Sequence, residues 1–246
     1  MTQDSPVVVA RSAGQHGETV LRRRGEVSEL IVDGVFTMDT AHTATEAALA
    51  RLALDRLDPD HPPSSRRDLA VLVGGLGLGV TARTLLDDPR VATVDVVELD
   101  GALVGWIAEG LVPSARGLLD DSRIRVRVAD VADAVPALPD AVVDAVLLDV
   151  DNGPDFLVHQ TNARVYEPAF LQAAWRVLRP GGVLAVWSAD LSRTLRDALE
   201  DVLGNCEEVV LPVRRDGREF AYAVYLGRRQ SRDQSRDQAR DQAGNQ

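Results

Sequence analysis

The chain has 246 residues, of which 45% are hydrophobic and 26% are charged, a composition typical of a globular protein with one or two domains. Acidic residues outnumber basic ones by 38 to 27, and the net charge of −11 disfavours binding to nucleic acid or to an anionic membrane. All basic residues are Arg, and the lack of Lys excludes Schiff-base chemistry, a pyridoxal-phosphate lysine and a P-loop.

The single cysteine, Cys206, cannot form an internal disulfide and cannot make a zinc site alone. The N-terminal segment lacks the basic and apolar regions of a signal peptide, and no run of 18 apolar residues is present. We therefore expect a reduced, metal-free, cytoplasmic protein.

The first part of the chain has the pattern of a small β-meander. Its β-rich runs are separated by glycine and cover residues 7–11, 18–24, 29–34 and 35–39. Ala and Leu at helical spacing predict a helix over residues 41–57, and the Pro- and Ser-rich segment 58–67 predicts a linker. We expect a β-rich domain over residues 1–40, a helix and linker over 41–67, and a boundary near residue 67.

From residue 68 onward, apolar strand patterns alternate with helical ones, which is typical of a mostly parallel sheet covered on both faces. The predicted strands are 69–74, 93–99, 123–128, 144–149 and 182–188, and the predicted helices are 79–87, 101–110, 165–178 and 190–203. Two further strand-like runs, 207–215 and 218–227, predict a terminal antiparallel hairpin. We expect an α/β, Rossmann-like domain over residues 68–229, and a disordered RDQ-repeat tail over 230–246.

A glycine-rich loop follows the first predicted strand of this domain and leads into a helix. It contains Gly74, Gly75, Gly77 and Gly79, and such residues let the backbone turn sharply and approach a ligand. Glycines also serve tight strand-to-helix packing, so the loop alone is weak support. Glu98 strengthens the interpretation, because it lies 19 residues beyond Gly79 at the end of the next strand, where a carboxylate can bind ribose hydroxyls.

Two further acidic residues follow strand ends. Asp130 could accept a hydrogen from an adenine amino group or cap the following helix, and Asp100 is a candidate helix cap. Together these positions predict a nucleoside at the carboxyl edge of the sheet. NAD is less favoured, because GGLGLG departs from GxGxxG. The GLGLG sequence at 75–79 instead resembles the loop of class I S-adenosylmethionine-dependent methyltransferases.

Over residues 18 to about 226 the chain more closely resembles the spermidine and spermine synthase family. The resemblance is carried by LIVDGVFTMD, VGGLGLG, VDVVELD, DSRIRVRVAD, LLDVDNGPDF and VYEPAFLQAAWRVLRPGGVLAV. It implies a small β-domain before a methyltransferase-like domain, a homodimer, and transfer of an aminopropyl group from decarboxylated S-adenosylmethionine to a small cationic amine.

The resemblance also implies residue roles. Glu98 would hold the ribose, Asp130 the adenine amino group, and Asp149 would be the catalytic acid/base. An alkyl amine is protonated at neutral pH, so it must lose a proton before its nitrogen attacks. Asp151 and Asp155 would add negative potential around the amine, although both can also be explained as turn or solvated residues.

The chain departs from the family pattern at the glycine loop and after the β-domain. Gly77 stands where the synthases carry the Asp that holds the donor's amine, and Ala44-Thr45-Glu46 replaces their Tyr-His-Glu, which leaves Glu46 as a substrate-binding candidate. Two alternatives therefore stay open. One is an S-adenosylmethionine-dependent methyltransferase, and the other is a catalytically inactive homologue that binds a nucleoside or a partner protein.

Overall fold

The N-terminal part of the chain forms a four-stranded antiparallel sheet. The computed structural model describes residues 5–14, 17–57, 68–150, 152–154, 157–158, 160–215 and 217–230. Within them the sheet runs in sequence order through β1 (Val7–Gly14), β2 (Gly17–Arg24), β3 (Val27–Val32) and β4 (Val35–Asp39). The predicted meander is thus confirmed. The third strand ends at Val32, earlier than expected, because Asp33 and Gly34 both take positive φ and turn the chain.

The helix that follows this sheet begins three residues later than its sequence pattern suggests. It is α1, Ala44–Leu57, and the residues before it form a turn around Asp39. The carboxylate oxygen Oδ1 of Asp39 accepts hydrogen bonds from the backbone N–H groups of Ala41 and His42, at 2.9 and 2.7 Å. These contacts hold residues 41–43 outside the helix.

The second sheet has seven strands and forms the centre of the molecule. Its strands are β5 (Leu69–Gly74), β6 (Val91–Glu98), β7 (Ile124–Val128), β8 (Val143–Leu148), β9 (Leu178–Ser188), β10 (Glu207–Arg215) and β11 (Arg218–Arg228). They lie in the order β10-β11-β9-β8-β5-β6-β7. Strands β5 to β9 are parallel, whereas β11 is antiparallel to both of its neighbours. The expected fold class, with its terminal hairpin, is confirmed.

The strand order changes direction at β5, which pairs with β6 on one side and with β8 on the other. In open α/β sheets, ligands bind beyond the carboxyl ends of the strands at such a reversal. The loops after β5, β6 and β8 are therefore the places where a ligand is expected.

The helices cover both faces of this sheet. They are α2 (Val80–Leu86), α3 (Gly101–Ala108), α4 (Val131–Ala134), α5 (Pro168–Val177) and α6 (Arg193–Leu203), with 3₁₀ turns at η1 (Pro113–Ala115) and η2 (Gln160–Tyr166). The helix predicted over 165–178 is divided between η2 and α5. Pro168 stands in the first turn of α5, where proline is favoured, and Leu178 is already extended. The short helix α4 was not predicted.

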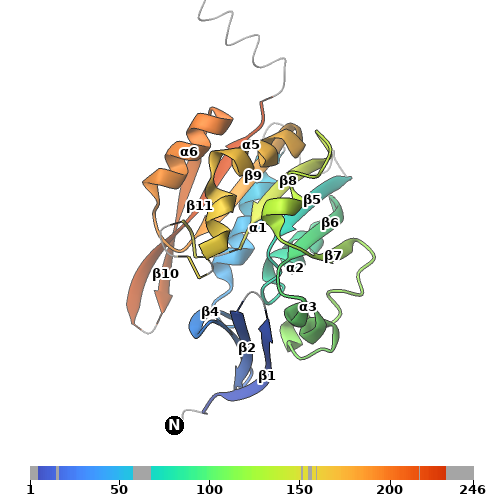
Figure 1. The fold of residues 1–246 in the computed structure, drawn as a ribbon, viewed down its shortest axis with the longest axis vertical. Coiled ribbons are helices and arrows are strands. Elements are labelled where there is room, and N and C mark those ends of the chain that lie inside the picture. Colours follow the sequence, from blue (N-terminus) through green and yellow to red (C-terminus); the bar gives the residue numbers. More distant parts are fainter. Residues whose placement is uncertain are drawn as a thin grey trace, which may run out of the picture.

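Two apolar cores lie on the two faces of the central sheet. Helices α1, α2 and α3 pack into one core, and α4, α5 and α6 pack into the other. Leu21 and Leu30 of the small sheet join the first core, so the small sheet is packed against the body of the molecule. Figure 1 shows it below the central sheet, next to α3.

Parts of the predicted domain organisation lie outside the described residues, namely the linker 58–67 and nearly all of the tail 230–246. The domain division therefore stays a prediction. None of the helices in the described ranges is long and apolar enough to cross a membrane.

Candidate functional site

The glycine loop between β5 and α2 lies directly against the end of β8. Gly75 has φ of +92°, and a Cβ atom on it would lie 2.1 Å from the carbonyl oxygen of Asp149. Gly77 has φ of +50°, and a Cβ atom there would lie 2.7 Å from the sulfur of Met38. Gly75 therefore requires glycine, whereas a side chain at Gly77 would require the Met38 side chain to shift, and both positions line the cavity described below.

The other two loop glycines have packing roles. A Cβ on Gly74 would meet the side chain of Val131 at 3.0 Å, and Gly79 is the residue before α2, with φ of +84°. Neither is among the residues that line the cavity. Their predicted role in binding a cofactor stays a prediction.

Glu98, at the end of β6, holds the glycine loop in place. Its carboxylate accepts hydrogen bonds from the backbone N–H of Leu76 at 2.7 Å and from that of Asp100 at 2.8 Å. The residue is 8% exposed. Burial raises the pKa of Glu98, and hydrogen bonds from the backbone N–H groups of Asp100, Leu76 and Gly77 oppose that rise. A carboxylate has about four acceptor sites, so the side chain can also accept from a ribose hydroxyl.

Asp100 and Asp130 both cap helices, as their positions suggested. The carboxylate of Asp100 accepts from the N–H of Ala102 at 2.8 Å, and that of Asp130 accepts from the N–H of Ala132 at 2.7 Å. Asp130 also accepts through its second oxygen from Arg164 of η2, at 3.2 Å. Both aspartates line the cavity, so the capping interpretation and the binding interpretation are compatible.

Asp149 comes directly after β8 and is partly buried beside α1 and α2. The hydroxyl of Thr81, in the first turn of α2, donates a hydrogen bond of 2.7 Å to its Oδ2. Burial, together with the negative charges of Glu46 and Glu98, raises the pKa of Asp149 to about 7, while the Thr81 hydroxyl opposes the rise. A carboxyl group with such a pKa can both accept and release a proton at neutral pH.

Glu46 lies in the first turn of α1 and is buried, with 7% of its surface exposed. It accepts a hydrogen bond from the hydroxyl of its neighbour Thr45 at 2.7 Å. Although Glu46 and Asp149 are far apart in the sequence, both line the same cavity. The structure thus brings together the predicted catalytic residue and one predicted substrate-binding residue.

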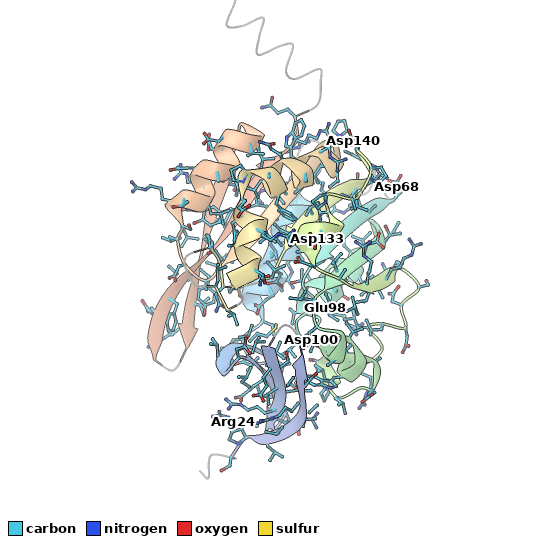
Figure 2. The ribbon with its side chains drawn as sticks, in the orientation of Figure 1. Arg24, Asp68, Glu98, Asp100, Asp133 and Asp140 are labelled. Atoms are coloured by element: carbon cyan, nitrogen blue, oxygen red, sulfur yellow. The ribbon has the colours of Figure 1, made fainter. Side chains whose placement is uncertain are left out.

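The cavity has a volume of about 250 Å³ and lies between the small sheet and the carboxyl edge of the central sheet. Figure 2 shows Glu98 and Asp100 at this junction, whereas Asp68 and Asp140 lie at the opposite end of the central sheet. Five acidic residues line the cavity, and no Arg or His is found among the described residues of its wall: Glu46, Glu98, Asp100, Asp130 and Asp149. Such a cavity favours a ligand that carries positive charge.

Several residues of the wall were not anticipated from the sequence. Met38 of β4 contacts the glycine loop, where its sulfur accepts the N–H of Leu78 at 3.3 Å. Trp187, near the end of β9, lines the cavity and packs edge-on against Tyr222. Strands β1 to β3 also contribute to the wall, for example through Thr19. No local sequence pattern marks these positions, because each acts across a tertiary contact.

Two predicted substrate-binding residues, Asp151 and Asp155, lie outside the described residues. Their roles therefore stay predictions. The described ranges contain no group of three or more His, Cys, Asp or Glu side chains that could hold a metal ion.

Comparison with known proteins gives one family match. The spermine/spermidine synthase domain matches residues 60–215, which is more than half of the chain. A polyamine aminopropyltransferase of Mycobacterium tuberculosis is 31% identical over 185 residues, covering 74% of this chain and 32% of that protein. A spermidine synthase of Coffea arabica is 25% identical over 183 residues, or 73% of this chain and 52% of the coffee protein. The chain thus spans about a third of the length of the first relative and about half of the length of the second.

Solved structures share the fold at low sequence identity. A crystal structure of spermidine synthase in complex with the transition-state analogue AdoDATO has a TM-score of 0.75 at 17% identity, covering 90% of this chain and 73% of that one. Spermidine synthase from Thermotoga maritima has a TM-score of 0.73 at 16% identity, with coverage of 90% and 72%. At this level of identity the likeness establishes the fold alone.

Proposed function

The chain belongs to the spermine/spermidine synthase family, and on that premise we propose that it transfers an aminopropyl group from decarboxylated S-adenosylmethionine to a small amine. The observation that carries the proposal is the acidic cavity at the switch point of the sheet, with five carboxylates and no basic side chain among its described lining residues. Both proposed substrates are cations, and the cavity's charge is complementary to them. Relatives named as aminopropyltransferases support the same reaction.

The nucleoside part of the donor is proposed to bind along the ends of β5, β6 and β7. Glu98 would accept hydrogen bonds from ribose hydroxyls, and Asp130 would accept one from the adenine amino group, while Gly75 lets the backbone come close. Apolar neighbours such as Val97 and Leu103 would contact the ring. This arrangement leaves the sulfonium and its aminopropyl chain directed toward Asp149.

Asp149 is proposed as the catalytic acid/base. Its carboxylate takes a proton from the ammonium group of the acceptor, and the freed nitrogen attacks the carbon next to the sulfonium. A C–N bond forms as the C–S bond breaks, the electron pair stays on sulfur, and 5′-methylthioadenosine leaves. The buried Glu46, together with Asp151 and Asp155, which follow β8 in the sequence, is proposed to add the negative potential that holds the amine.

The family match favours aminopropyl transfer over methyl transfer or an inactive homologue. Isothermal titration calorimetry with 5′-methylthioadenosine, decarboxylated S-adenosylmethionine and S-adenosylmethionine would rank the donors. Turnover with putrescine or spermidine, followed as release of 5′-methylthioadenosine, tests the reaction. We expect the decarboxylated donor to bind more tightly than S-adenosylmethionine and to react. If none of the three nucleosides binds saturably, the proposed function is wrong.

We further propose that the protein is a homodimer, as its family resemblance implies, and that it is cytoplasmic, as its single cysteine suggests. Light scattering after size exclusion would then give about twice the chain mass of 26.6 kDa. A mass of one chain at micromolar concentration would contradict the dimer.

A further inference from the structure

Thr81 joins three elements around the candidate catalytic residue. It lies in the first turn of α2, directly after the glycine loop, and only 3% of its surface is exposed. Its hydroxyl is 2.7 Å from Oδ2 of Asp149, at the end of β8, and 3.5 Å from the backbone carbonyl oxygen of Glu46, on α1. The sequence pattern did not single out this residue.

The hydroxyl of Thr81 has one proton to donate. The carboxylate of Asp149 is its preferred acceptor, because that contact is 0.8 Å shorter than the contact to the Glu46 carbonyl and because hydrogen bonds to charged groups are stronger. Among the described side chains, Thr81 is the one that donates a recorded hydrogen bond to Asp149. The carboxylate is therefore held through Oδ2, and Oδ1 is left without this donor.

We propose that Thr81 is the positioning residue of the transfer reaction: it holds Oδ2 of Asp149 so that Oδ1 faces the acceptor amine and takes its proton. The proposal rests on the role of Asp149 in the proposed function. In the reaction, the N–H bond of the ammonium breaks, the O–H bond to Oδ1 forms, and the nitrogen lone pair attacks the donor carbon. Thr81 keeps its own proton throughout.

The charges around Asp149 make this hydrogen bond important. The negative side chains of Glu46, on α1, and Glu98, on β6, both raise the pKa of Asp149, as does burial, and the Thr81 hydroxyl opposes all three. Without that hydroxyl, a larger fraction of Asp149 would be protonated at neutral pH and unable to accept a proton. The carboxylate would also be free to rotate about its Cβ–Cγ bond.

Three variants distinguish the effect of the Thr81 hydroxyl from the effect of the side chain's shape. Thr81→Val keeps the shape and removes the donor, whereas Thr81→Ser keeps the donor and removes a methyl group. Thr84→Val is the matched control, because Thr84 lies one turn later on α2 and its hydroxyl donates to the carbonyl of Val80 at 2.9 Å, away from the cavity. If Thr81→Val does not fold, Thr81→Ala removes the same donor.

The acid limb of kcat/KM for the amine reports the pKa of the base in the free enzyme. We expect Thr81→Val to move this limb upward by about one pH unit. That shift corresponds to a decrease in kcat/KM of about fivefold at pH 7 and of less than about twofold at pH 9. Thr81→Ser and Thr84→Val should keep the wild-type profile. A loss of the same size at every pH in Thr81→Val, with no shift of the acid limb, would show a structural role and overturn the proposal.

A ¹³C NMR titration of the Asp149 carboxyl, assigned with Asp149→Asn, tests the hydrogen bond without any turnover. A higher pKa in Thr81→Val than in the wild type and in Thr84→Val supports the positioning role. An unchanged pKa overturns it. If Thr81→Val raises the pKa of Asp149 but the wild-type enzyme transfers nothing, the proposed function is wrong and the contact between Thr81 and Asp149 still stands.

Discussion

Replacing Asp149 with Asn should stabilise the protein at neutral and alkaline pH while abolishing transfer. The pKa of Asp149 rises from 3.8 to about 7 on folding, mainly because the carboxylate is buried and lies near Glu46. Between these values the folded protein binds a proton that the unfolded chain releases, so the stability conferred by this group falls as pH rises from about 4 to 7. Well above pH 7 the stability conferred by this group is fully lost.

The magnitude follows from the size of the shift. A rise from 3.8 to about 7 is about three units, and at 1.36 kcal/mol per unit the charged carboxylate destabilises the fold by about 4 kcal/mol. Asp149 lines the cavity, where water reaches it and screens its charge, so we expect about 2 kcal/mol. Asn has nearly the same shape, and its amide oxygen can still accept the hydrogen bond from Thr81.

Urea unfolding of wild type and Asp149→Asn at pH 5, 6, 7 and 8 measures this effect through the change in the denaturation midpoint. The stability difference should grow in favour of the variant from pH 5 to pH 7 and then level off. Asp197→Asn, an exposed position on α6, is the control and should change stability by less than about 0.5 kcal/mol at every pH. A difference for Asp149→Asn that is independent of pH would refute the reasoning.

The other predictions concern binding and packing. Asp149→Asn should bind 5′-methylthioadenosine as the wild type does but lose at least about a hundredfold in kcat, and unchanged turnover would remove this residue from the mechanism. Glu98→Gln should weaken binding of 5′-methylthioadenosine by about tenfold in calorimetry. The amide has one oxygen, whereas the two oxygens of the carboxylate each accept a backbone N–H. Equal affinity would contradict a role at the ribose. Gly75→Ala should lower stability by about 3 kcal/mol or prevent folding, because its Cβ would lie 2.1 Å from a backbone oxygen; a wild-type urea midpoint would show that the loop is free to move. Gly77→Asp should lower Tm by about 5 °C, because the new Cβ atom would lie 2.7 Å from the Met38 sulfur. Adding Met38→Ala should recover part of that loss, and no recovery would mean that the contact is not the cause.

The sequence predicted the fold and the position of the glycine loop beside Glu98 because both depend on local patterns. Each strand of the central sheet is a short apolar run, and the glycine loop with Glu98 follows a spacing set by one strand-helix-strand unit. The helix caps at Asp100 and Asp130 are likewise local, since each carboxylate bonds to an N–H two residues later. These features need no knowledge of how distant segments pack.

The surroundings of Asp149 depend on contacts that no local pattern records. Thr81 and Asp149 are separated by 68 residues, and Leu78 and Met38 by 40. The raised pKa of Asp149 depends on burial against α1 and α2, and therefore on tertiary packing. The division of the segment 165–178 into η2 and α5 was missed for another reason, because apolar periodicity continues through Pro168 while the backbone turns before it.

The hydrogen-bond donors around the cavity's carboxylates explain why these groups can bind a cationic substrate. Glu98, Asp100 and Asp130 accept from backbone N–H groups, and Glu46 and Asp149 accept from threonine hydroxyls. All of these donors are neutral, so they stabilise the carboxylates without cancelling their charge. Among Glu98, Asp100, Asp130 and Asp149, the Asp130 carboxylate has an ion pair with a described side chain, that of Arg164. A cation bound beside Asp149 would therefore supply charge compensation that the described lining of the cavity lacks, and the same uncompensated charge is what Asp149→Asn is expected to relieve.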